Sequence, residues 1–122
     1  MRNLRTMLVA LTILGAFLAN AQDAETVSLV QVPGKFEQTE LTLKAGATYI
    51  FEVANTGVDH EVGFVIAPKG KTDQANHVPS AYLKSTVKDG ETAQSNEVVL
   101  EKGEYVYFCP LNPTPQYKIT VE

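Results

Sequence analysis

From Thr26 to the end of the chain, apolar and polar residues alternate with a period of two. β-Branched and aromatic residues are concentrated in seven short segments, which are separated by turns that contain glycine or proline. These segments are residues 26–32, 40–43, 48–53, 61–66, 96–100, 104–108 and 117–121. Short strands at this spacing predict an all-β fold, an antiparallel β-sandwich of seven or eight strands.

One stretch of the chain, residues 71–85, does not alternate. Pro79 prevents a long helix there, because proline cannot continue the helical hydrogen bonds. We expect an excursion with one helical turn, held against the sandwich by Val78, Tyr82 and Leu83.

The first 21 residues have the three regions of a signal peptide. Arg2 and Arg5 form a basic start, residues 7–19 form an apolar run, and small residues precede a cleavage site after Ala21. An apolar run of 13 residues is too short for a membrane span of about 20. We therefore predict a signal peptide at residues 1–21 and one domain at 22–122, periplasmic or secreted and without a membrane span. The alternative is an uncleaved amphipathic anchor.

The charge of the chain excludes one class of partner. The sequence has 10 basic and 14 acidic residues, a net charge of −4. Removal of Arg2 and Arg5 with the signal peptide leaves 8 basic and 14 acidic residues, a net charge of −6. Nucleic acid is excluded as a partner, because phosphate binding requires an excess of Lys and Arg.

Cys109 is the only cysteine, so no disulfide can form within the chain. A free thiol in an oxidising compartment is prone to oxidation unless it is buried or bound to a metal. Cys109 is therefore a candidate metal ligand, with a small buried side chain as the alternative.

Three elements of the sequence resemble the cupredoxins, the plastocyanin-like blue copper proteins. The first is Asn-x-Gly-x-x-His at residues 55–60, the second is Gly-x-Tyr-x-Tyr-x-Cys-Pro at 103–110, and the third is the last strand, 117–121. The resemblance covers nearly all of residues 26–122. It implies a Greek-key β-sandwich in which two His, one Cys and a weak axial Met hold copper.

Two of the four implied copper ligands are present. His60 and Cys109 match the first His and the Cys, whereas Asn112 and Tyr117 stand where the family has the second His and the Met. An amide and a protonated phenol are much weaker copper ligands than imidazole. Gln116 offers an amide oxygen, but strand alternation directs it away from the face of Tyr117.

Other side chains near these positions have simpler interpretations. His77 lies in the excursion, where we expect it to be exposed or locally hydrogen-bonded, because the chain would have to double back to bring it to Cys109. Asp59 and Glu61 are expected to be surface charges. His60 has a second interpretation, in which it bonds a turn carbonyl beside an inert Cys109.

These observations favour a small exported copper-binding protein with an incomplete or altered type 1 site. A thiolate and one imidazole suit Cu(I), so copper handling is favoured over electron transfer, with a redox or copper-trafficking protein as partner. The alternative is a metal-free binding or assembly module.

In the metal-free alternative, the proline-rich loop 110–116 with Tyr82, Tyr107 and Tyr117 forms a protein-contact surface. Catalysis is the weakest option, because the sequence has no third group to orient a Cys109–His60 pair. We therefore expect a protein that is not an enzyme. The sequence leaves the oligomeric state open.

Overall fold

The computed structural model describes residues 23–122. The predicted signal peptide lies outside these residues, and so does its cleavage site. No helix in the described part is long and apolar enough to cross a membrane.

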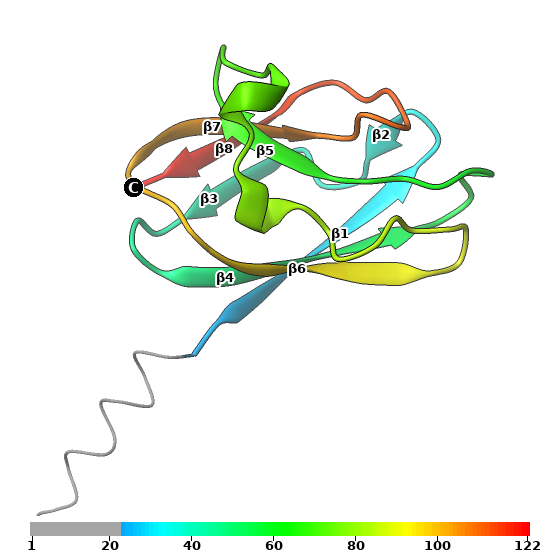
Figure 1. Ribbon diagram of the computed structural model, residues 1–122, viewed down its shortest axis with the longest axis horizontal. Coiled ribbons are helices and arrows are strands. Elements are labelled where there is room, and N and C mark those ends of the chain that lie inside the picture. The colour runs from blue at the N-terminus through cyan, green and yellow to red at the C-terminus, as the bar shows by residue number, and fades with distance from the viewer. Residues whose placement is uncertain (1–22) are drawn as a thin grey trace, which may run out of the picture.

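Within residues 23–122, eight strands form two four-stranded sheets that pack face to face (Figure 1). The first sheet has the order β2-β1-β4-β6, and its strands are β1 (Glu25–Val32), β2 (Lys35–Phe36), β4 (Thr48–Asn55) and β6 (Thr92–Val99). The second has the order β3-β8-β7-β5, with β3 (Glu40–Leu43), β5 (Val65–Pro68), β7 (Gly103–Phe108) and β8 (Tyr117–Val121). The predicted all-β sandwich of seven or eight strands is confirmed.

The prediction that the sandwich is antiparallel is wrong for two strand pairs. β1 runs parallel to β4 over seven residue pairs, and β3 runs parallel to β8. The other pairs are antiparallel. Alternation shows that one face of a strand is buried, but it does not show the direction of the neighbouring strand.

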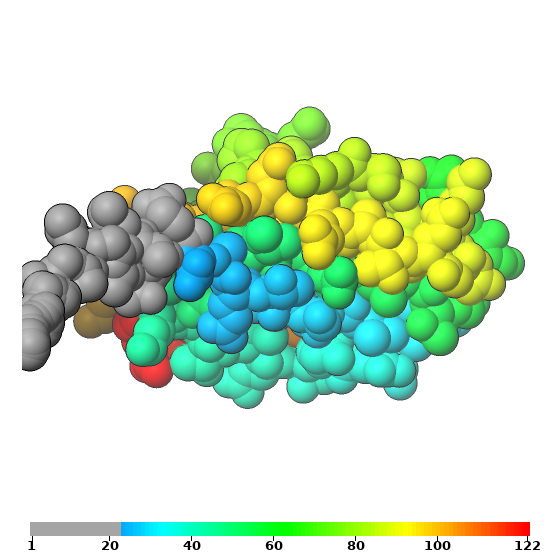
Figure 2. Space-filling view, turned by 90° about the horizontal axis from the view of Figure 1, so that it is seen from below, coloured from blue at the N-terminus to red at the C-terminus, as the bar shows by residue number. Residues whose placement is uncertain are grey.

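The core lies between the two sheets and follows the alternation. In β4, Tyr49, Phe51 and Val53 are buried, and the residues between them are half-buried on the outer face. That outer face is seen from below in Figure 2, with β1 in blue and β6 in yellow. In β8, Ile119 and Val121 face the core as predicted, and Tyr117 packs against it partly buried.

The strand predicted at residues 61–66 is wrong in its position. The ladder of β5 begins at Val65, and Val62 forms only an isolated bridge to Val87. Between them, the backbone of Gly63 bonds to side chains: its carbonyl accepts from Gln31 and its N–H donates to the Cys109 sulfur. Gly63 is therefore held by side chains and is not part of the ladder between β5 and β7.

The excursion contains two 3-10 turns, η2 (Gln74–Asn76) and η3 (Pro79–Ala81), rather than one helical turn. Val78 and Leu83 pack against the core as predicted. Tyr82 is exposed, and the fully buried residue of this segment is Ala81, which is too small to be recognised in the sequence as an anchor.

Candidate functional site

Three loops meet at the end of the sandwich opposite the C-terminus (Figure 1). They follow β4, precede β6 and connect β7 to β8. The first and third of these loops carry His60, Cys109 and Asn112. The predicted site residues therefore lie at one end of the molecule, as chain order indicated.

Asn55 fixes the loop that carries His60. The side chain of Asn55 is buried at 1% exposure. Its Nδ2 donates to the carbonyls of Val58 at 3.2 Å, His60 at 3.1 Å and Val87 at 3.1 Å. Its Oδ1 accepts from the Val58 N–H at 2.9 Å. This explains the Asn in the Asn-x-Gly-x-x-His element, while Gly57 provides the turn with a φ of 88°.

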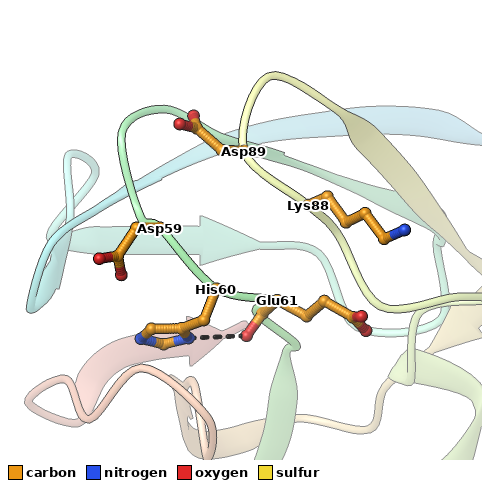
Figure 3. A pocket seen from close by; sticks show the side chains of 5 residues that line it. All are labelled: Asp59, His60, Glu61, Lys88 and Asp89. Carbon is orange, nitrogen blue, oxygen red and sulfur yellow. Dashed lines mark hydrogen bonds between the residues drawn. The ribbon is translucent and has the colours of Figure 1, made fainter.

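His60 is exposed on the rim of a shallow pocket whose other lining residues are charged (Figure 3). Its Nδ1 lies 3.0 Å from the backbone carbonyl oxygen of Glu61. This bond is of the kind that the second interpretation of His60 requires. The lining side chains in Figure 3 point in different directions and do not converge on one point; they are Asp59, His60, Glu61, Lys88 and Asp89.

Cys109 is buried at 2% exposure. Its sulfur accepts two backbone hydrogen bonds, from Gly63 at 3.3 Å and from Asn112 at 3.1 Å. Its own N–H donates to the hydroxyl oxygen of Thr114 at 3.2 Å. The thiol is therefore part of the packed interior and does not line the pocket of His60.

Asn112 occupies the position of the second His of the family, and its amide is fully engaged. Oδ1 accepts from the Gly34 N–H at 2.9 Å. Nδ2 donates to Oε1 of Gln31 at 3.1 Å and to the carbonyl of Val32 at 3.0 Å. With 4% of its surface exposed, Asn112 fastens the loop after β7 to the β1–β2 turn.

Tyr117, at the position of the Met, also has a structural role. Its hydroxyl oxygen accepts from the Phe36 N–H at 3.3 Å, and its ring packs on Phe36 and Tyr107. The Tyr107 hydroxyl donates to the backbone carbonyl of Gln38. Burial, with a smaller contribution from Tyr117, raises the pKa of Tyr107 well above its ordinary value.

The remaining candidate residues lie away from the thiol or face solvent. Gln116 is exposed, in line with its predicted direction. His77 is locally hydrogen-bonded, as expected: Nε2 lies 3.0 Å from the Thr72 carbonyl oxygen and Nδ1 lies 2.8 Å from the Tyr82 hydroxyl. Its ring packs edge-on against Phe108.

These side chains do not fit a type 1 copper ion. Within residues 23–122, no group of three or more His, Cys, Asp and Glu side chains is placed to hold a metal. A type 1 site requires a second imidazole, whereas the amide of Asn112 is engaged on both its oxygen and its nitrogen. The only methionines, Met1 and Met7, precede the described residues.

An apolar groove adjoins the loop that follows Cys109. Leu111 is 49% exposed and Tyr82 is 37% exposed. A groove beside them has mainly apolar walls; its lining residues are Gly63, Phe64, Val65, Tyr82, Leu83, Ser85, Thr86 and Pro110. Leu111 lies in the proline-rich loop 110–116 that the sequence suggested as a contact surface, but a single Leu in such a loop shows no periodicity that would single it out.

Comparison of the sequence finds no relative, whereas comparison of the structure identifies the fold. No protein-family model matches the sequence. No curated protein is significantly similar to it.

Solved structures match over most of the chain. Auracyanin A, a "blue" copper protein from the green thermophilic photosynthetic bacterium Chloroflexus aurantiacus, has a TM-score of 0.67 at 20% identity, over 82% of this chain and 100% of that one. Reduced auracyanin from Roseiflexus castenholzii has a TM-score of 0.64 at 16% identity, over 81% of this chain and 98% of that one. A reduced amicyanin variant has a TM-score of 0.53 at 19% identity, over 84% of this chain and 88% of that one. The chain therefore has a cupredoxin-like fold, as its sequence predicted.

Proposed function

We propose that this is an exported cupredoxin-like protein that works without a type 1 copper ion and binds another protein through its loop end. The observation that carries the proposal is the environment of Asn112. Its amide replaces an imidazole ligand with three hydrogen bonds that hold two loops together. The role is non-catalytic, and the predicted signal peptide at residues 1–21 supports export.

The apolar surface around Leu111 supports a protein partner. An exposed apolar patch on a firmly held loop is typical of an interaction site. Leu111 and Tyr82 are the exposed members of this surface, beside the groove that includes Pro110. Tyr107, which the sequence suggested as part of a contact surface, is fully buried and cannot take part.

Titration with Cu(II) tests the metal-free part of the proposal. We expect the purified protein, with Cys109 reduced, to show no intense thiolate-to-copper absorption and to lose added copper on desalting. An intense blue band would contradict the proposal. Replacement of His77 by Ala would then show whether that residue completes the site.

A pair of matched surface variants tests the interaction. Leu111→Asp places a charge in the apolar surface, whereas Val99→Asp places one on a residue 57% exposed on β6. In the exported fraction of the native host, the proteins that cross-link to the wild type should also cross-link to Val99→Asp but not to Leu111→Asp. Equal recovery with both variants would show that the Leu111 surface is not the contact.

Copper handling through Cys109 and His60 is the second candidate function. It is favoured by the two N–H groups that donate to the Cys109 sulfur, because hydrogen bonds to a ligating sulfur orient it and tune a bound metal. Competition for Cu(I) against a coloured chelator separates the two candidates. Copper handling requires tight binding that is lost in both Cys109→Ser and His60→Ala and kept in His77→Ala. Equal binding by the wild type and Cys109→Ser would reject it.

A further inference from the structure

A closed ring of hydrogen bonds includes the thiol sulfur of Cys109. Gln31 Nε2 donates to the Gly63 carbonyl at 2.6 Å, and the Gly63 N–H donates to the Cys109 sulfur at 3.3 Å. The Asn112 N–H donates to the same sulfur at 3.1 Å, and Asn112 Nδ2 donates to Gln31 Oε1 at 3.1 Å. Gln31, Cys109 and Asn112 have exposures of 0%, 2% and 4%. The ring therefore lies in the interior, and the sulfur is one of its members.

The ring joins segments that are far apart in the sequence. Asn112 is 78 residues from Gly34 and 80 from Val32, and it bonds the backbone of both. The loop is also held from within, because Thr114 accepts the Cys109 N–H. The loop after β7 thus cannot leave the thiol without breaking the Asn112 side-chain bonds.

We propose that Asn112 is a latch that holds loop 110–116 closed over Cys109 and so keeps the thiol from reacting with disulfides. Thiol–disulfide exchange requires the sulfur to reach a disulfide sulfur in line, which a buried sulfur with two N–H donors cannot do. Reaction must then wait for the loop to open. This inference goes beyond the proposed function and does not depend on the presence of a partner protein.

The latch predicts a measurable change in thiol reactivity. In the test reaction with the aromatic disulfide DTNB, the Cys109 thiolate forms a mixed disulfide and releases one coloured thionitrobenzoate. Each of the three Asn112 side-chain bonds favours the closed loop by a factor of about five. We therefore expect the native-state rate to increase about 100-fold in Asn112→Ala.

A matched control separates local opening from general loss of stability. Ser95 is buried at 1%, and its hydroxyl accepts from the Phe51 N–H and donates to the Asn96 carbonyl, in β6 rather than in the three loops. Ser95→Ala should therefore react at nearly the wild-type rate. An unchanged rate in Asn112→Ala, or rates in both variants that follow their global stability, would overturn the latch.

A measurement on the wild type keeps the proposal testable if Asn112→Ala does not fold. At low urea concentrations, reaction through a local opening of the loop depends weakly on urea, because little surface is exposed. Reaction through global unfolding has the full urea dependence of the unfolding equilibrium. We expect the weak dependence, and the full dependence at all urea concentrations would overturn the proposal.

Discussion

Replacement of Asn55 by Ala should destabilise the protein by about 3 kcal/mol. The Nδ2 group faces three carbonyl oxygens but has only two hydrogens, so it contributes two full hydrogen bonds, and Oδ1 contributes a third. A typical net contribution is about 1 kcal/mol for each bond, and buried carbonyls left without donors add to the loss. For a domain of this size, the corresponding decrease in Tm is roughly 12 to 24 °C.

Urea unfolding followed by circular dichroism measures this free energy, with Asn76→Ala as the control. Asn76 is exposed, and its Nδ2 bonds only to Asp73 at the surface. We expect its replacement to change stability by less than about 0.5 kcal/mol. A loss below about 1 kcal/mol for Asn55→Ala at an unchanged urea dependence would refute the idea that Asn55 holds the His60 loop.

Further predictions concern the buried Tyr107, the two departures from the copper-ligand pattern and the signal peptide. Because burial raises the pKa of Tyr107 in the folded state, the contribution of its neutral form to the free energy of unfolding should be fully present below pH about 10 and should decrease as the pH rises above this unfolded-state value. In urea unfolding across this pH range, the free energy of unfolding of Tyr107→Phe should decrease more gradually than that of the wild type. The double variant Asn112→His with Tyr117→Met should gain an intense blue band with Cu(II) that Tyr117→Met alone does not show, whereas a blue band from the unmodified protein would show that another residue, with His77 the first to test, completes the site. Intact-mass analysis of protein from the native host should give a chain that begins at Gln22, and a mass that retains residues 1–21 would contradict export.

The sequence predicted the class of fold better than it predicted the strand directions. Alternation depends on burial of one face, and it correctly predicted that Ile119 and Val121 face the core. The parallel pairing of β1 with β4 depends on which distant segments meet, and alternation within one segment contains no such information. The start of β5 was also misplaced: the backbone of Gly63 bonds to the side chains of Gln31 in β1 and Cys109 in the loop after β7, and alternation does not reveal such bonds.

The sequence predicted which residues lie in the loops but not the hydrogen bonds that they make. The departure at Asn112 was apparent from the spacing, whereas its role depends on Gln31, a polar residue at an inward-facing position of β1. A polar residue on the inward face of a predicted strand was the one available signal of a buried network.

The place of the last strand determines when this chain can fold. β8 lies between β3 and β7, and β3 pairs with no other described strand. β1, at the other end of the described chain, pairs with β4 across a long separation in sequence. Non-local pairing of this kind makes folding slow, because loop closure precedes the gain from contacts. The second sheet stays incomplete until residue 121 is available, so β3 and β7 cannot be joined in one sheet before β8 has been synthesised.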